Sequence, residues 1–208
     1  MLTFDQAFAE MPLVAILRGV RPDEVVDIAG ALYDEGIRIV EVPLNSPDPL
    51  DSIARLKAFE GRMVWGAGTV LETAQVDAVL DAGGTIVVSP NTNTDVIALT
   101  VRHGAASLPG FGTATEAFAA WSAGARILKL FPAVAFGSDY LKALAAVLPR
   151  EAVVVPVGGV GPASMAEWWA AGARGFGLGS DLYKPGMTAS DVAARARTAV
   201  DAMRALIG

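Results

Sequence analysis

The sequence predicts an α/β protein with a (β/α)₈ barrel (TIM barrel) fold, in one compact domain that spans residues 1–208. Alanine-rich stretches of helical character end in a small residue and a glycine, and an apolar run follows each of these glycines. Such units recur at an even spacing along the chain. Eight short apolar strands that alternate with helices within 208 residues are typical of a barrel at the small end of its size range.

The predicted helix ends follow one another in chain order. A glycine just past a helix is the usual terminator, because it tolerates a positive φ. The terminating glycines are Gly36, Gly83, Gly104, Gly124 and Gly172. Their spacings are 47, 21, 20 and 48 residues. Each long gap fits two units of about 24 residues and contains a further apolar run.

The predicted strands are the apolar runs themselves. In order they are "LVAILRG" (13–19), "IRIVEV" (37–42), "RMVWGAG" (62–68), "TIVVS" (85–89), "AASLPG" (105–110), "ARILKLF" (125–131), "AVVVPVGG" (152–159) and "ARGFGLGS" (173–180). A doubly wound open sheet is the competing architecture. The even spacing, and the lack of a GxGxxG motif after the first run, favour the barrel.

Composition excludes several classes of protein. Hydrophobic residues make up 53% of the chain and charged residues 18%, which argues against disorder. The net charge of -6, without a basic stripe, argues against a nucleic-acid partner. The chain has no cysteine and one histidine, so we expect no metal site and no cofactor. The acidic start of the sequence and the lack of a long apolar run indicate a cytoplasmic protein without a membrane partner.

Polar and glycine-rich positions gather at the carboxyl ends of the predicted strands, where barrel enzymes place their active sites. In chain order these positions are Arg18, Glu41, Gly66–Thr69, Ser89–Asn91 with Pro90 at its centre, Pro109–Gly110, Lys129, Gly158–Gly159 and Gly179–Ser180. Charged residues among strand ends that are otherwise apolar call for a functional explanation.

Alternation along the strands places two charged residues inside the barrel. Lys129 shares the interior face of its strand with Phe131, and Glu41 shares that of another strand with Ile37 and Ile39. Both strands are even-numbered, and alternate strands contribute to the same interior layer. We therefore expect Lys129 and Glu41 to meet across the mouth of the barrel.

A lysine and a carboxylate without metal or cysteine suit Schiff-base chemistry. The amine attacks a ketone, and the resulting iminium stabilises a neighbouring carbanion. Burial among apolar side chains lowers the pKa of Lys129, whereas an ionised Glu41 raises it. We assign proton transfer to Glu41. A purely structural Lys129–Glu41 pair is the alternative interpretation.

Residues at the remaining strand ends are suited to bind a substrate. Gly158 and Gly159, together with Gly179 and Ser180, occupy the two strand ends where barrels commonly bind phosphate through backbone N–H groups. Arg18 is suited to bind a carboxylate. The alternative, purely structural interpretation is that the glycines form tight turns and that Arg18 forms a salt bridge at the rim.

At this point the residues match a known family. The chain resembles the 2-dehydro-3-deoxy-phosphogluconate and phosphogalactonate aldolases along nearly its whole length. The motifs that carry the resemblance are "AILRG", "VEVPLNSP", "GAGTVL", "SPN", "PGFGTATEAF", "LKLFPA", "VGGV" and "GLGSDLY".

The resemblance implies a class I aldolase with a Schiff base at Lys129 and acid/base catalysis by Glu41. It further implies phosphate binding around Gly158, Gly159, Gly179 and Ser180. Arg18 and Thr69 are then expected near the pyruvate carboxylate, and Pro90 ("SPN") joins the substrate-binding residues. It also implies a homotrimer, and a phosphorylated 2-keto-3-deoxy sugar acid as substrate.

Two positions bear on the C4 epimer of the substrate. Gluconate-type relatives carry Arg and Thr where this chain has Asn45 and Val157, and galactonate-type relatives carry the arginine at the position of Arg18. We therefore expect cleavage of 2-dehydro-3-deoxy-6-phosphogalactonate to pyruvate and D-glyceraldehyde 3-phosphate. The alternatives are the gluconate epimer or both epimers and, more distantly, a non-covalent phosphosugar isomerase or epimerase, or an interaction protein without catalysis.

Overall fold

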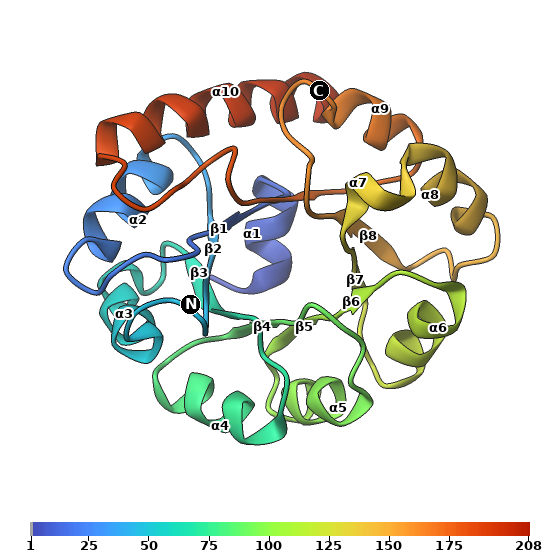
Figure 1. Cartoon of the computed structure of the whole chain (residues 1–208), viewed down its shortest axis with the longest axis horizontal. Coiled ribbons are helices and arrows are strands. Elements are labelled where there is room, and N and C mark those ends of the chain that lie inside the picture. Colours follow the sequence, from blue (N-terminus) through green and yellow to red (C-terminus); the bar gives the residue numbers. More distant parts are fainter. Residues whose placement is uncertain (1) are drawn as a thin grey trace.

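The computed structural model describes residues 2–208 as short parallel strands inside a ring of helices (Figure 1). The strands are β1 (Leu13–Ile16), β2 (Ile39–Pro43), β3 (Val64–Gly68), β4 (Ile86–Val88), β5 (Ala106–Leu108), β6 (Gly110–Phe111), β7 (Ile127–Leu130), β8 (Val153–Pro156) and β9 (Phe176–Leu178). They form a curled six-stranded sheet in the order β5-β4-β3-β2-β1-β9 and a three-stranded sheet in the order β6-β7-β8. One isolated parallel bridge, Val157 to Gly177, connects the two sheets.

The helices lie outside the strands, apart from α1 (Figure 1). They are α1 (Phe4–Glu10), α2 (Val25–Asp34), α3 (Pro49–Arg55), the 3₁₀ helix η1 (Leu56–Phe59), α4 (Thr73–Asp81), α5 (Thr94–Arg102), α6 (Ala114–Ser122), α7 (Ala133–Phe136), α8 (Ser138–Ala145), α9 (Met165–Ala170) and α10 (Ala189–Ile207). The five predicted terminating glycines all have positive φ, which confirms the predicted helix ends. Among the described residues, none of these helices combines the length and apolarity needed to cross a bilayer.

The sequence predicts one strand where the structure has two. The run "SLPGF" is divided at Pro109: β5 pairs with β4, and β6 pairs with β7. Proline has no backbone N–H, so it cannot donate to a strand ladder and interrupts regular pairing. Its carbonyl still accepts a hydrogen bond from the Lys129 N–H, at 2.9 Å. The chain therefore passes from one sheet to the other at this residue.

Alternation along the strands divides the core into two layers. Inward-facing side chains such as Ile39 and Ile127 form one apolar cluster, and outward-facing ones such as Val40 and Leu128 pack in a second cluster with the helices. The predicted faces are confirmed for both strands. Ile37 was wrongly expected on the interior face: it lies two residues before β2 begins and packs in the outer cluster.

Helix α1 closes the amino-terminal end of the strands. Its residues Phe4 and Ala7 belong to the interior cluster, where they join Val14, Ile39 and Val64 from the first three strands. In Figure 1 this helix lies inside the ring of outer helices. Helix α1 therefore covers part of the amino-terminal end of the strands, and the carboxyl ends are left for a site.

Helix α10 is the last element and packs against α2. Its first turn is fixed by a capping box, in which the Asp191 N–H donates to Thr188 Oγ1 at 3.2 Å and the Thr188 N–H donates to Asp191 Oδ2 at 3.0 Å. Such a cap satisfies backbone donors that the helix itself leaves without a partner. Its buried residues include Val192 and Met203.

We predict that Thr188→Ala lowers the free energy of unfolding by about 1 kcal/mol, the usual cost of losing a threonine cap. Thr198→Ala is the matched control, because Thr198 lies inside α10, is exposed, and bonds only the Ala194 carbonyl. Alanine favours a helix interior, so the control should be neutral or slightly stabilising. Urea unfolding followed by circular dichroism measures both. Equal stability of the two variants would contradict the capping role.

Candidate active site

A cavity of about 130 Å³ opens at the carboxyl ends of the strands. Eight of the ten predicted site residues line it, namely Arg18, Glu41, Lys129, Val157, Gly158, Gly159, Gly179 and Ser180. They come from segments that lie far apart in the sequence, from β1 to the loop after β9. The structure therefore brings most of the predicted site together.

Lys129 reaches the cavity from β7. Its strand neighbours are Gly110 in β6 and Val155 in β8, so the backbone is held on both sides. Only 6% of the residue is exposed. The Nζ atom lies 4.7 Å from the centroid of the Phe131 ring, on the same face of the strand. An aromatic face attracts an ammonium but offers no hydrogen bond to it.

Glu41 reaches the same cavity from β2, with 2% of the residue exposed. Its Oε2 atom is buried without a hydrogen-bond partner. A carboxylate without donors is poorly solvated, so the charged form is disfavoured. Burial accordingly raises the pKa of Glu41 to about 7, against the opposing charges of Lys129 and Arg18.

Burial acts on Lys129 in the opposite direction. It lowers the pKa of Lys129 to about 8, while the charge of Glu41 raises this pKa and the charge of Arg18 lowers it further. The directions are those expected from the sequence. Burial therefore moves the pKa values of the amine and the carboxyl toward one another.

Arg18 stands two residues beyond β1, at the rim of the cavity. Its Nη1 atom donates to Asn45 Oδ1 at 2.6 Å. The side chains at positions 18 and 45 are thus in direct contact. Within the part of the chain that the structure describes, Arg18 makes no ion pair shorter than 4.0 Å. Its charge therefore faces the cavity without a carboxylate in contact.

The loops after β8 and β9 form a further part of the cavity lining, and β9 is the strand next to β1. Gly158 and Gly159 both have positive φ, 92° and 76°, which glycine adopts without strain. The turn after β9 is fixed by the Gly179 carbonyl, which accepts hydrogen bonds from two N–H groups further along the turn. Arg195 of α10 holds it from outside by donating to the Ser180 carbonyl at 3.1 Å.

Two predicted residues do not line this cavity. Thr69 follows β3 and has φ +59°, an uncommon conformation for a residue with a side chain. Pro90 follows β4, and its carbonyl lies so close to Gly110 that a side chain at Gly110 would collide with it. Both stand at carboxyl ends of strands, on the same side of the sheets as the cavity.

Five further residues line the cavity without having been assigned to the site from the sequence. They are Ile16, Phe131, Val160, Gly177 and Asp181. Alternation along the strands was the available signal for the first two, since Ile16 and Phe131 each lie two residues from a predicted site residue. Asp181 directly follows Ser180, but position alone did not indicate that it borders the cavity.

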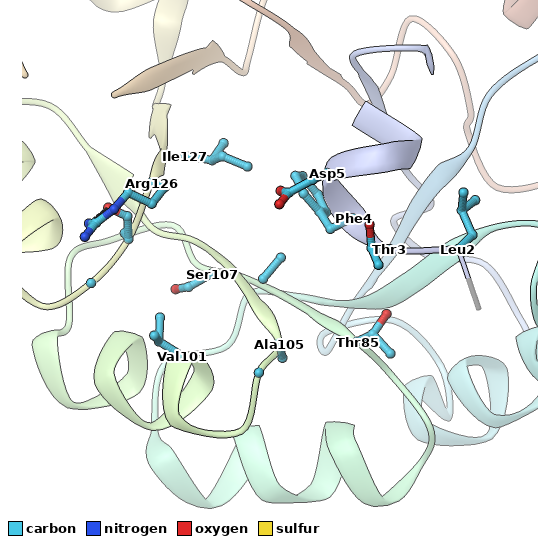
Figure 2. A pocket seen from close by; sticks show the side chains of 14 residues that line it. Leu2, Thr3, Phe4, Asp5, Thr85, Val101, Ala105, Ser107, Arg126 and Ile127 are labelled. Atoms are coloured by element: carbon cyan, nitrogen blue, oxygen red, sulfur yellow. Dashed lines mark hydrogen bonds between the residues drawn. The ribbon is translucent and has the colours of Figure 1, made fainter. Parts of the chain in front are cut away.

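A larger cavity of about 470 Å³ lies at the other end of the strands, beside α1. Figure 2 shows it between Phe4 and Asp5 of α1 and a wall that includes Val101 and Ser107. Arg126 lines it as well, but its guanidinium donates to two backbone carbonyls and lies 4.1 Å from the Trp121 ring. Function in parallel α/β folds belongs to the carboxyl ends, so we assign the site to the smaller cavity.

Comparison with known proteins identifies the family of the chain. The KDPG and KHG aldolase family matches residues 4–196, and the chain belongs to this family. Among its relatives, 2-dehydro-3-deoxy-6-phosphogalactonate aldolase of Escherichia coli is 48% identical over 94% of this chain and 96% of that protein. A probable enzyme of the same name from Rhizobium meliloti is 48% identical over 96% of this chain and 94% of that protein.

A solved structure described as native KDPGal is also similar. It superposes with a TM-score of 0.94 at 47% identity, covering 95% of this chain and 97% of that chain.

Of the residues that the structure describes, no three His, Asp or Glu side chains gather in a way that would hold a metal ion.

We predict that Lys129 reacts with acetic anhydride at lower pH than an ordinary lysine. An amine is nucleophilic only when deprotonated, so a lowered pKa shifts its labelling to lower pH. The labelling rate should rise with a midpoint of about 8, against about 10.4 for a free lysine. Peptide mass spectrometry measures it, with the exposed Lys57, Lys142 and Lys184 as internal references.

Glu41→Gln tests the cause of this shift. Because the charge of Glu41 raises the pKa of Lys129, the midpoint should fall further in that variant. A midpoint near that of a free lysine in the parent protein, or a rise in the variant, would contradict the electrostatic description of the pair.

Proposed function

We propose that the chain is a class I aldolase, in which Lys129 forms a Schiff base with the substrate ketone and Glu41 transfers protons. The observation that carries this proposal is the shared cavity in which a buried amine and a buried carboxyl meet. Their pKa values, about 8 and about 7, suit a nucleophile and an acid/base at neutral pH. Membership of an aldolase family supports the same assignment.

The chemistry follows from these two groups. The neutral Lys129 amine adds to C2 of the substrate. Protonated Glu41 donates its proton to the carbinolamine hydroxyl, which leaves as water, and this gives an iminium and the Glu41 carboxylate. Glu41 takes the proton of the C4 hydroxyl while the C3–C4 bond breaks. The electron pair of that bond forms the C2–C3 double bond, and the iminium electrons move to the nitrogen, which gives an enamine. The aldehyde leaves, Glu41 returns the proton to C3, and water releases pyruvate and the free amine.

The proposed substrate is 2-dehydro-3-deoxy-6-phosphogalactonate, which yields pyruvate and D-glyceraldehyde 3-phosphate. Two relatives at 48% identity carry names of this activity. The arginine at position 18 agrees with this substrate, because galactonate-type relatives carry the arginine there, and here it donates to Asn45 at the rim. The gluconate epimer is the second candidate, since Val157 presents no hydroxyl that selects either epimer.

The two ends of the substrate suit different groups of residues in the cavity lining. We place the phosphate at Gly158, Gly159, Gly179 and Ser180, where backbone N–H groups and a hydroxyl are available as donors. Arg18 is the charged group proposed for the carboxylate. Thr69 and Pro90 stay predictions as binding residues.

The finer architecture is part of the proposal. We propose that the two sheets form one closed (β/α)₈ barrel, in which β5 and β6 are two halves of a single strand. The bridge from Val157 to Gly177 and the Lys129–Pro109 hydrogen bond support closure at both junctions. Residues 1–208 would then form one catalytic domain. The homotrimer and the cytoplasmic location stay predictions; a similar structure at 47% identity is a cage designed by fusing symmetric oligomeric domains.

We predict that sodium borohydride traps pyruvate on Lys129. Reduction converts the imine to a stable amine, so intact mass should increase by one reduced pyruvyl group, and peptide mapping should locate it at Lys129. Lys129→Arg should be neither trapped nor active, because guanidinium stays protonated. Retained turnover in a folded Lys129→Arg protein would refute the proposal, and turnover without trapping in the parent would favour the isomerase alternative.

We predict that the parent cleaves the galactonate epimer at least as well as the gluconate epimer, with discrimination of about 10²-fold or less. An apolar surface rejects a misplaced hydroxyl poorly. Val157→Thr adds a hydroxyl of nearly equal volume and should shift the ratio of kcat/KM values toward gluconate. Parallel kinetics on both epimers measure this. A parent that clearly favours gluconate would overturn the assigned substrate but not the aldolase chemistry.

A further inference from the structure

Strand β3 carries two glycines on its interior face. Gly66 lies beside Glu41 in the parallel register of β2 and β3, and Gly68 lies beside Pro43. Ala67 between them faces outward and packs in the outer cluster. The motif "GAGT" therefore leaves two interior positions next to Glu41 without side chains.

The two glycines have different neighbours. A methyl group on Gly66 would collide first with the backbone carbonyl of Ile86, so Gly66 allows β3 and β4 to approach. A methyl group on Gly68 would instead collide with Cδ and both oxygens of Glu41, which are its three nearest atoms. The carboxyl of Glu41 thus occupies the space that a Cβ atom at position 68 would need.

The backbone does not explain this glycine. Twelve glycines have positive φ, and Gly68 is not among them, so a residue with a side chain would adopt the same conformation. Its position is well fixed, because its carbonyl accepts a hydrogen bond from the Leu44 N–H at 2.8 Å. Position 68 must therefore lack a side chain, because the carboxyl of Glu41 occupies the space that a side chain would take.

Hydrogen bonding does not hold the carboxyl in place. Glu41 Oε2 is buried and has no hydrogen-bond partner. No side-chain hydrogen bond to either oxygen of Glu41 is found within residues 2–208. Contact with Gly68 therefore determines how far the carboxyl sinks into β3 and, with it, how the carboxyl faces the cavity that it shares with Lys129.

We propose that Gly68 is a positioning residue, which provides the seat on which the Glu41 carboxyl rests and so sets its orientation toward the reacting atoms. The inference rests on the proposed function, in which Glu41 transfers protons. Gly68 itself touches no substrate in this scheme. It acts through Glu41 alone, and this dependence makes the proposal testable.

The first experiment is Gly68→Ala. The added methyl displaces the carboxyl toward the cavity, so kcat should fall by about 10²- to 10⁴-fold, the range of general acid–base catalysis, with a smaller effect on KM. Borohydride should still trap pyruvate, because Lys129 is unchanged. The displaced carboxyl gains solvent, which lowers the pKa of Glu41, so the acidic limb of the pH–rate profile should move to lower pH.

A double-mutant cycle separates positioning from general damage. In the Glu41→Gln background the proton-transfer group is already lost, so Gly68→Ala should cause little further loss of kcat. Gly30→Ala is the control: Gly30 lies in α2, and a methyl there meets only Phe59, at 3.7 Å. This control should keep the parental rate and pH profile.

Stability provides a test that needs no activity. If Gly68→Ala lowers Tm, Glu41→Ala in the same protein should recover most of the loss, because it removes the atoms that collide. A recovered Tm supports the proposal even where the single variant folds poorly, and an equal loss in both backgrounds overturns it.

The outcomes distinguish this inference from the proposed function. A parent protein that neither turns over nor traps pyruvate refutes the function itself. If the parent is active and traps pyruvate, but Gly68→Ala keeps the parental kcat and pH profile, only the positioning role of Gly68 is refuted. Losses that add fully in the kinetic cycle also refute it, because Gly68 would then act independently of Glu41.

Discussion

The structure depends on placing an amine and a carboxyl where water hardly reaches them. Lys129 and Glu41 are almost fully buried, and each is disfavoured in its charged form by that burial. Burial raises the pKa of one and lowers the pKa of the other. A buried ion pair adds little stability, whereas removing one partner leaves an uncompensated charge. The pair is therefore better understood as a reactive device that the fold tolerates than as a source of stability.

The surrounding elements make this burial possible. The interior cluster fills the strands below the pair, and α1 closes that end with Phe4 and Ala7. The outer cluster packs the opposite faces of the same strands against the helices. Strand pairing on both sides of β7 fixes the backbone of Lys129. The scaffold thus supplies the apolar surroundings that lower the pKa of the Lys129 amine.

Much of this was predictable from the sequence, for physical reasons that particular residues illustrate. Alternation along a strand has a period of two, so Lys129 and Glu41 were placed on interior faces correctly. Glycines after helices located the helix ends, because few other residues tolerate positive φ. Eight of the ten predicted site residues share one cavity, since parallel strands collect their carboxyl ends on one side.

What sequence reasoning missed depends on contacts between segments far apart in the chain. Ile37 was assigned to the interior by extending the alternation beyond the start of β2, where the chain no longer follows strand geometry. The division at Pro109 arises because neighbouring strands pair with different residues on either side of it. The proximity of Gly68 to the Glu41 carboxyl is a packing relation that no local pattern reports.

The packing of α1 limits the direction of access to Lys129, and the covalent bond to Lys129 sets the order of events in the proposed reaction. Phe4, Ala7 and the interior side chains above them pack below Lys129, and the cavity that Lys129 lines opens at the carboxyl ends of the strands. In the proposed reaction the three pyruvyl carbons stay bonded to Lys129 when the C3–C4 bond breaks, whereas the phosphorylated aldehyde is then free to leave. The aldehyde therefore departs first, water enters after it, and pyruvate leaves last. Synthesis in the reverse direction must load pyruvate before the aldehyde.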